Sequence, residues 1–232
     1  MDYFKNLLMI NEEKYKELRE FCAERKIDLI AVSKKQPNEK IEYLYNLGHR
    51  DFGENRVEEL QGKRHLFPED IRWHFIGHLQ SKKAKLLDPI PYLIHSVDRQ
   101  KLLRVLEKEG AKRDQKINIL IQIKIAEEDS KYGFTFEEAE KAIDSLINEE
   151  YPHLVLKGLM AMATFTEDEE QLQNEFGSIA KFMEKMREKQ ADSPESLKVL
   201  SIGMSNDYNI AAEAGGNMLR IGSAIFGARQ YD

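Results

Sequence analysis

The chain of 232 residues carries 35 Lys and Arg against 41 Asp and Glu, a formal net charge of −6 at pH 7, which excludes a general attraction to nucleic acid or anionic lipid. The single cysteine, Cys22, excludes an internal disulfide framework. Neither a secretory signal nor an apolar run near the roughly 20 residues that cross a bilayer is present, so we expect a cytoplasmic protein that does not bind membranes.

The sequence begins with a predicted helix at about 11–25 and then alternates short β-branched runs with segments that can form helices. This alternation is typical of a parallel sheet with helical crossovers. The eight predicted strands are Leu29–Ser33, Asp51–Gly53, Trp73–Ile76, Leu93–Val97, Asn118–Ile125, Val155–Ala163, Val199–Gly203 and Met218–Ile221. No long linker rich in Pro, Gly or Ser separates them. We therefore predict an α/β fold, a single closed (β/α)8 TIM barrel formed by residues 1–232 with an extra N-terminal helix.

Two of the predicted crossover helices carry recognisable start signals. Thr135, followed by Glu138, is expected to cap one helix, and Asp98 is expected to lie at the start of another near Arg99. The longest helix is predicted at about 168–190. Its apolar stripe spans too few heptads for a coiled coil, so we expect it to pack against the barrel. The stripe consists of Leu172, Phe176, Ile179, Met183 and Met186.

Functional side chains in such a barrel come from the carboxyl ends of the strands and from the loops that follow. Phosphate is usually bound after the seventh and eighth strands. Polar residues and glycines do follow several predicted strands at this end. They are Lys34, Asn55, His78, Ser205, Gly222 and Ser223.

Lys34 directly follows the first predicted strand. Side chains alternate along a strand, so Lys34 shares a face with Ile30 and Val32, whereas Lys35 lies on the other face. Both faces are apolar, and the alternation therefore leaves open which one points to the barrel axis. If Lys34 points inward, desolvation should lower its pKa and favour attack on an aldehyde. A solvated lysine at a strand end is the alternative interpretation.

A glycine- and serine-rich end of the chain offers a place for phosphate. Gly222 and Ser223 precede a short segment that can begin a helical turn, and Ser205 lies in the neighbouring loop. A turn glycine and a capping serine are the alternative. An amine facing a phosphate site is what a protein needs to hold a phosphorylated aldehyde, and the pairing predicts pyridoxal 5'-phosphate (PLP) as the cofactor.

Arg220 lies on the eighth predicted strand, where a permanent charge inside a small barrel requires an acceptor. A pyridine nitrogen would serve. Because arginine keeps its proton, it would hold that nitrogen unprotonated and make the ring a weaker electron sink. A salt bridge with Asp207 or Glu213 is the alternative.

The remaining motifs are weaker. His74 and His78 have the spacing of a helical metal pair but lie in a predicted strand and turn, so we predict no metal site. Neither Gly-x-Gly-x-x-Gly nor a Walker-type Gly-Lys-Ser/Thr is present, which argues against nicotinamide and nucleoside triphosphates. Lys131 is a candidate second amine near the mouth, although a solvated loop lysine is the simpler interpretation.

Several segments, spread over nearly the whole chain, together resemble one known family. They are Ala31-Val-Ser-Lys34, Phe52-Gly-Glu-Asn55, Trp73–Gln80, Asp129-Ser-Lys-Tyr-Gly133, Lys157-Gly-Leu-Met-Ala161, Gly203-Met-Ser205 and Arg220–Gly227. On these segments the chain is similar to the pyridoxal phosphate homeostasis proteins, relatives of the barrel domain of bacterial alanine racemase. The fold implied by this resemblance is the same TIM barrel.

The resemblance also implies roles for the candidate residues. Lys34 would form the internal aldimine with PLP, and Arg220 would meet the pyridine nitrogen. The phosphate would be held by Ser205, Gly222 and Ser223, and Asn55 and Met160 would lie near the ring. Lys35 departs from the usual threonine and places a charge beside Lys34, whereas Asn209 replaces a common acidic residue at a helix start only.

The implied function is PLP binding and a part in intracellular PLP homeostasis and delivery, without established turnover and without an assigned catalytic residue. The racemase relatives complete their sites with a second domain and a tyrosine of the partner subunit, and we expect neither here. We therefore expect a monomer, with PLP-dependent apo-enzymes as candidate partners. A racemase-like enzyme that acts on amino acids is the first alternative, and an aldolase-type Schiff-base enzyme acting on sugar phosphates is the second.

Overall fold

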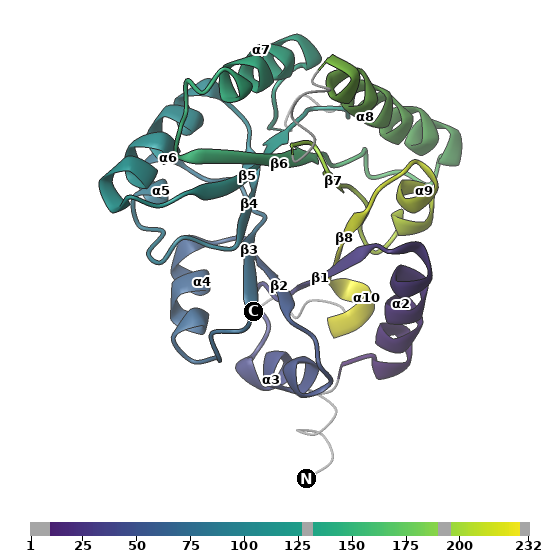
Figure 1. Ribbon diagram of the computed structural model, residues 1–232. Coiled ribbons are helices and arrows are strands. Elements are labelled where there is room, and N and C mark those ends of the chain that lie inside the picture. Colours follow the sequence, from purple (N-terminus) through teal and green to yellow (C-terminus); the bar gives the residue numbers. More distant parts are fainter. Residues whose placement is uncertain (1–9, 127–131, 190–195, 228–232) are drawn as a thin grey trace.

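The computed structural model describes residues 10–126, 132–189 and 196–227. Its strands are β1 Asp28–Val32, β2 Asp51–Glu54, β3 Arg72–Phe75, β4 Leu93–Val97, β5 Ile117–Gln122, β6 Leu154–Met160, β7 Val199–Ser201 and β8 Met218–Ile221. They are parallel and form one closed barrel in chain order, with β8 paired to β1 (Figure 1). The predicted α/β barrel is confirmed, and each of the eight predicted strands is present. The division of the chain into domains stays a prediction.

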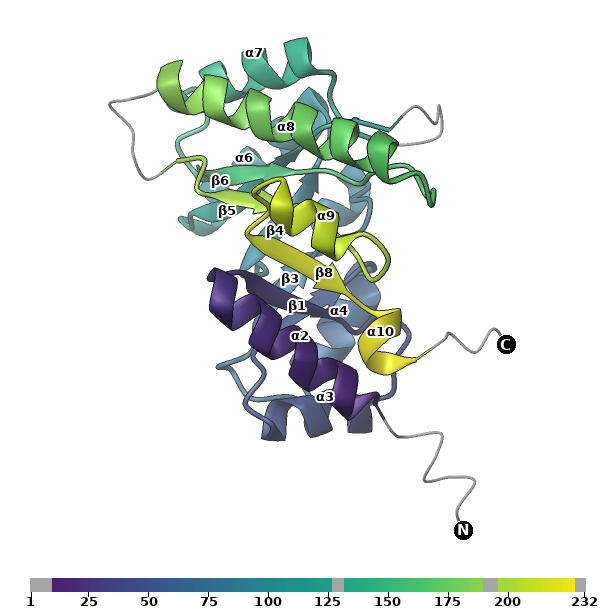
Figure 2. The same ribbon diagram turned by 90° about the vertical axis from the view of Figure 1, so that its right-hand side faces the viewer.

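Helices surround the barrel on the outside, between successive strands (Figures 1 and 2). They are α2 Glu12–Arg25, α3 Asn38–Asn46, α4 Val57–Arg64, α5 Ser81–Ala84, α6 Gln100–Arg113, α7 Phe136–Ile147, α8 Glu169–Lys189, α9 Tyr208–Glu213 and α10 Ser223–Phe226. The predicted N-terminal helix is α2. It lies beside α10, because the N–H of Asn11 donates to the carbonyl of Ile225 at 2.7 Å. No helix of the described segments is long and apolar enough to span a bilayer.

The structure separates the apolar side chains into an inner and an outer group. The outer group fills the space between the strands and the helices and includes Leu29 and Ala31. The inner group lies within the barrel and consists of Ile30, Leu93, Leu120, Met160 and Met218. Since Ile30 belongs to the inner group, the alternate residues of β1 point to the barrel axis, and the chain positions Lys34 on this inward face.

Strands β5 and β6 end earlier than predicted, and backbone hydrogen bonds explain why. Beyond Gln122, the N–H of Lys124 donates to the carbonyl of Phe134 at 3.0 Å, so the chain pairs with its own loop. The carbonyl of Ala161 accepts a hydrogen bond from the Arg220 guanidinium at 2.8 Å. Apolar sequence therefore continues past the point where the ladder stops.

The structure confirms the capping signal of α7, and at α6 it places Asp98 just before the helix as predicted but without a capping hydrogen bond. Thr135 caps α7 through a capping box, in which its side chain accepts from the N–H of Glu138 and the Glu138 side chain accepts from the N–H of Thr135. Asp98 does not cap α6, because its carboxylate binds the side chains of His78 and Arg99 instead. The stripe of α8 is buried as predicted, at Leu172, Phe176, Ile179, Met183 and Met186.

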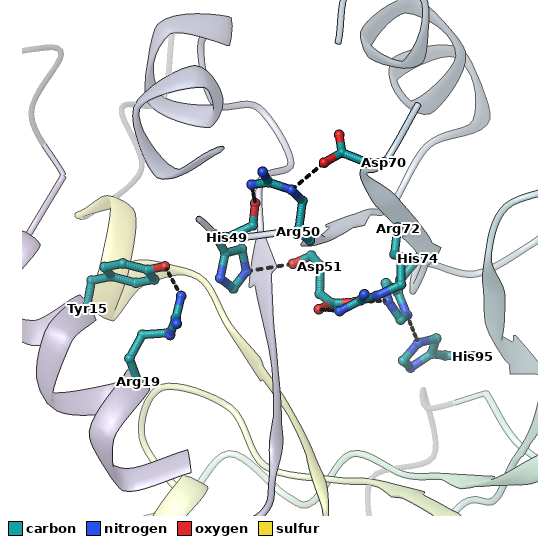
Figure 3. A network of polar contacts seen from close by, with 9 residues as sticks. All are labelled: Tyr15, Arg19, His49, Arg50, Asp51, Asp70, Arg72, His74 and His95. Atoms are coloured by element: carbon teal, nitrogen blue, oxygen red, sulfur yellow. Dashed lines mark hydrogen bonds and ion pairs between the residues drawn. The ribbon is translucent and has the colours of Figure 1, made fainter. Parts of the chain in front are cut away.

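His49, just before β2, is a buried imidazole whose Nε2–H donates to the carbonyl of Asp51 at 2.8 Å (Figure 3). Burial lowers its pKa from 6.5 to about 4. His49 therefore takes up a proton near pH 6.5 in the unfolded chain but only near pH 4 in the folded protein. The free energy of unfolding decreases as the pH falls through this window. Between pH 7 and 4, the wild type should lose about 3 kcal/mol more unfolding free energy than His49→Gln, measured by urea denaturation.

The control for this prediction is His65→Gln, which removes an exposed imidazole. Its unfolding free energy should follow the pH in the same way as that of the wild type. Parallel curves for the wild type and His49→Gln would contradict the assignment of the acid sensitivity to His49.

Candidate functional site

A cavity of about 250 Å³ opens at the carboxyl ends of the strands. It brings together six of the seven residues predicted to form the site, which come from the ends of β1, β2, β7 and β8 and from the loops that follow. These residues are Lys34, Asn55, Ser205, Arg220, Gly222 and Ser223. The individual roles assigned to them stay predictions.

Lys34 lines this cavity, and buried contacts hold the peptide just before it. The hydroxyl of Ser33 donates to Glu54 Oε1 at 2.6 Å, and Lys63 Nζ donates to the Ser33 carbonyl at 2.8 Å. Lys35 is exposed, has a left-handed φ of 57° and is not part of the cavity wall. The structure therefore points one of the two adjacent lysines into the cavity and the other away from it.

The anchor beneath Lys34 is a buried ion pair. Lys63 Nζ lies 2.8 Å from Glu54 Oε1 and 2.7 Å from Glu59 Oε1. Burial raises the pKa of Glu54 to about 7, although the Lys63 charge and hydrogen bond oppose the shift. A shift of the backbone at the end of β1 would break at least one of these buried contacts, so the ion pair fixes the position of this backbone.

Asn55 supplies a buried acceptor to the cavity. Its Oδ1 has no hydrogen-bond partner within the described residues, and a buried acceptor of this kind is costly unless a ligand or water satisfies it. Gly77 allows the backbone to approach Asn55 closely, because a Cβ at position 77 would lie 2.3 Å from the Asn55 carbonyl oxygen. The site therefore fits a ligand with a hydrogen-bond donor near Asn55.

Arg220 crosses from the barrel interior to the cavity wall. Its NH1 donates to Ser201 Oγ at 2.7 Å and its NH2 to the carbonyl of Ala161 at 2.8 Å. Burial lowers the pKa of Arg220 to about 10, and the charge of Asp207 acts in the opposite direction. The alternative of a salt bridge with Asp207 or Glu213 is wrong, because within the described residues neither carboxylate pairs with this guanidinium. A buried cation thus remains available to a ligand acceptor.

The loops after β7 and β8 are linked to each other. The N–H of Ala224 donates to Ser205 Oγ at 3.3 Å, which holds the two loops together beside the cavity. A Cβ at Gly222 would lie 3.3 Å from the Cβ of Val32, so a side chain there would press on the end of β1, two residues before Lys34. Small residues in these loops leave space where phosphate is expected.

The structure differs from the prediction at Met160, which is fully buried in the inner group below the cavity. Met162 lines the cavity instead. The loop that follows β6 also contributes Thr164, Phe165 and Thr166, which the sequence reasoning missed. A Thr-Phe-Thr segment after a predicted strand, at the edge that already carried Lys34, is the signal that could have revealed them.

The remaining candidates lie elsewhere. His74 points into the barrel interior, whereas the exposed His78 stacks on Tyr132 with 3.7 Å between ring centroids and lies 2.9 Å from the Asp98 carboxylate. Lys131 falls outside the described residues. Over residues 10–126, 132–189 and 196–227, no group of three or more His, Cys, Asp or Glu is arranged to hold a metal ion.

The chain is similar to known proteins over most of its length. Residues 11–230 match the family described as alanine racemase, N-terminal domain. The pyridoxal phosphate homeostasis protein of Helicobacter pylori is 39% identical over 202 residues, which cover 86% of this chain and 87% of that protein.

Solved structures agree with the sequence match. The structure of PipY from Synechococcus elongatus without PLP has a TM-score of 0.84 at 30% identity, covering 93% of this chain and 99% of that one. A second PipY structure, with PLP bound, has a TM-score of 0.80 at 29% identity and the same coverage.

Proposed function

This chain belongs to the family of pyridoxal phosphate homeostasis proteins and has their alanine racemase-type barrel, and from that membership we propose that Lys34 binds its cofactor PLP covalently and that the protein serves PLP homeostasis and delivery. The observation that supports this best is the meeting of Lys34, Arg220 and the Gly-Ser loop at 222–223 in one cavity at the carboxyl end of the barrel. The amine of Lys34, the guanidinium of Arg220 and the loop at 222–223 are complementary to the aldehyde, the pyridine nitrogen and the phosphate of PLP, respectively.

The covalent bond would form between Lys34 Nζ and the aldehyde carbon. Lys34 would hold the cofactor through its amine, and the aldehyde oxygen would leave as water together with the two protons of the neutral amine as the C=N bond forms. Bound PLP supplies an electron-withdrawing ring and an electrophilic carbon. The inward direction of the Lys34 face and the buried anchor at Ser33 support this assignment, because they hold the residue at the cavity wall.

The other residues would orient the cofactor. Arg220 would donate to the pyridine nitrogen, and Asn55 would accept a hydrogen bond near the ring through its buried Oδ1. Ser205, Gly222 and Ser223 would hold the phosphate. A permanently protonated partner keeps the pyridine nitrogen unprotonated and weakens carbanion stabilisation, which disfavours broad amino-acid chemistry.

The delivery role extends this proposal. We propose a monomeric cytoplasmic protein, one domain over residues 1–232, that passes PLP to PLP-dependent apo-enzymes. The net charge of −6 is consistent with a protein whose anion site is confined to a cavity.

The experiment that tests the function begins with purified protein incubated with PLP. We expect a visible absorption band that borohydride bleaches, and a reduced adduct on the peptide containing Lys34 in mass spectrometry. The loaded protein should then activate a PLP-dependent apo-enzyme faster than an equal concentration of PLP released from it would. Racemisation or transamination of any amino acid in a panel would instead support the enzymatic alternative, and absence of the adduct would refute both.

A further inference from the structure

A continuous string of polar side chains crosses the barrel interior beneath the cavity. Arg220 NH1 lies 2.7 Å from Ser201 Oγ, which lies 3.0 Å from His95 Nδ1. His95 Nε2 lies 2.9 Å from His74 Nδ1, and His74 Nε2 lies 3.2 Å from Asp51 Oδ1. We call these five residues the interior relay. Figure 3 shows its far half, from His95 through His74 to Asp51.

The two ends of the interior relay lie at opposite mouths of the barrel. Arg220 lines the cavity at the carboxyl ends of the strands. Asp51 and His74 line a second cavity of about 270 Å³ at the amino ends, together with Asp28 and Arg72. Between them, Ser201 and His95 are fully buried, so each of their polar atoms depends on a protein partner.

The chemistry of the two ends fixes the direction of the first and the last hydrogen bond of the interior relay. Arginine can only donate, and an ionised carboxylate can only accept. Burial raises the pKa of Asp51, but the hydrogen bonds from His74 and Arg72 outweigh this and hold it at about 2, so the carboxylate is ionised at pH 7.

The protons between these ends then follow in order. Ser201 accepts from Arg220 and donates to His95 Nδ1. His95 Nε2–H donates to His74 Nδ1, and His74 Nε2–H donates to Asp51. Burial also holds the pKa of His95 well below 6.5, which is consistent with a neutral ring. With the opposite order, Ser201 Oγ would accept twice and its own proton would have no acceptor among the described contacts.

We propose that the interior relay positions Arg220 for the pyridine nitrogen of PLP and couples the affinity for PLP to the carboxylate of Asp51 at the opposite mouth. This inference rests on the proposed function. Ser201, His95, His74 and Asp51 are positioning residues, because they act through Arg220 and are not part of the PLP cavity wall.

The physical basis is the compensation of a buried cation. The hydrogen bonds of Arg220 go to neutral oxygens, of Ser201 and Ala161, and not to a carboxylate. Hydrogen bonds that all run in one direction polarise each other in a low-dielectric interior. The Asp51 charge therefore strengthens the bond that holds NH1 in place, and its removal should loosen Arg220 without a change at the cavity wall.

The first test reads the proton order directly and does not involve PLP. In ¹⁵N NMR of histidine-labelled protein at pH 7, we expect both His74 and His95 as neutral Nε2–H tautomers, assigned with His74→Gln and His95→Gln. An Nδ1–H tautomer of His95, or a doubly protonated ring at either position, would overturn the relay.

The second test compares two carboxylates of the same mouth. Asp51→Asn removes the charge that ends the interior relay, and Asp28→Asn removes a charge from the same cavity that the relay does not include. The probe is pyridoxine 5'-phosphate, which lacks the aldehyde, so that Lys34 chemistry does not contribute. We expect its dissociation constant to rise by about three- to tenfold in Asp51→Asn and to stay within about twofold in Asp28→Asn.

A second pair of variants guards against a folding defect. His95→Leu breaks the relay, whereas the amide of His95→Gln can still accept at one atom and donate at another. We expect a larger loss of affinity in the leucine variant than in the glutamine variant, with both folded by circular dichroism; if the leucine variant does not fold, the Asp51→Asn comparison decides. Equal affinities of Asp51→Asn, Asp28→Asn and wild type would refute the coupling. A wild type that binds neither PLP nor the probe would refute the proposed function instead.

Discussion

Lys34→Ala is expected to abolish the reduced PLP adduct and the visible absorption band of the loaded protein. The cavity wall would keep Asn55, Arg220 and the loop at 222–223, so weak noncovalent binding should remain. Loss of the covalent bond should lower the affinity for PLP by at least about 100-fold, or about 3 kcal/mol. Borohydride reduction followed by intact-protein mass spectrometry measures the adduct, and equilibrium dialysis measures the residual affinity.

The matched control for this variant is Lys35→Ala. The two lysines are adjacent, but Lys35 is exposed and lies outside the cavity wall. Its removal should leave both the band and the adduct unchanged. A persistent adduct in Lys34→Ala would assign the aldehyde to another lysine and overturn the covalent proposal, whereas loss of the adduct in both variants would show that the test reports on the loop rather than on Lys34.

Gly158→Ala is expected to produce the largest loss of stability of any single change considered. Gly158 pairs with Val199 across β6 and β7. A Cβ at position 158 would lie 1.8 Å from the Val199 carbonyl oxygen and 2.6 Å from its carbonyl carbon. These are backbone atoms, so the clash can be relieved only by separating two strands of a closed barrel. We expect a loss of more than about 4 kcal/mol of unfolding free energy, or no soluble folded protein.

Gly62→Ala provides the comparison for this change. Gly62 lies in α4 and is exposed, and apart from its chain neighbours and the backbone of its own helix no atom of the described residues lies within 4 Å of an added Cβ. Alanine there should raise the unfolding free energy by about 0.5–1 kcal/mol, because glycine is unfavourable inside a helix. Urea denaturation of both variants measures the difference. A Gly158→Ala protein as stable as the wild type would contradict the strand register of β6 and β7.

The effect of Gly158→Ala should reach the cofactor site as well. Strand β7 carries Ser201 of the interior relay and leads into the loop of Ser205. A partly folded variant should therefore bind PLP weakly even though position 158 does not line the cavity. The stability of the ladder and the shape of the site are properties of the same strands.

The number of strands, the fold class and six of the residues that line the cavity could be predicted from the amino-acid sequence. Apolar runs that alternate with helical stretches are local patterns, so they can be recognised in the sequence without knowledge of the tertiary structure. The polar residues at strand ends, from Lys34 to Ser223, could be gathered into one site because all carboxyl ends of a parallel barrel meet at one edge.

Which face of β1 points inward, and with it the direction of Lys34, could not be predicted from the sequence and is seen in the folded barrel. Both faces of that strand are apolar, and the choice between them depends on how the barrel closes. Met160 and Met162 share the inward face, and the tertiary structure separates them by depth, because Met160 is buried in the inner group whereas Met162 lines the cavity. The hydropathy of a side chain does not distinguish a position inside the barrel from a position between the strands and the helices.

The interior relay shows the difference most clearly. His74, His95 and Ser201 lie on β3, β4 and β7, far apart in sequence, and each alone is compatible with a polar residue that interrupts an apolar run. Their hydrogen bonds depend on the relative register of strands and on the small diameter of an eight-stranded barrel, which brings inward side chains of non-neighbouring strands into contact. Strand register is a property of the closed sheet, and so is the path from Asp51 to Arg220.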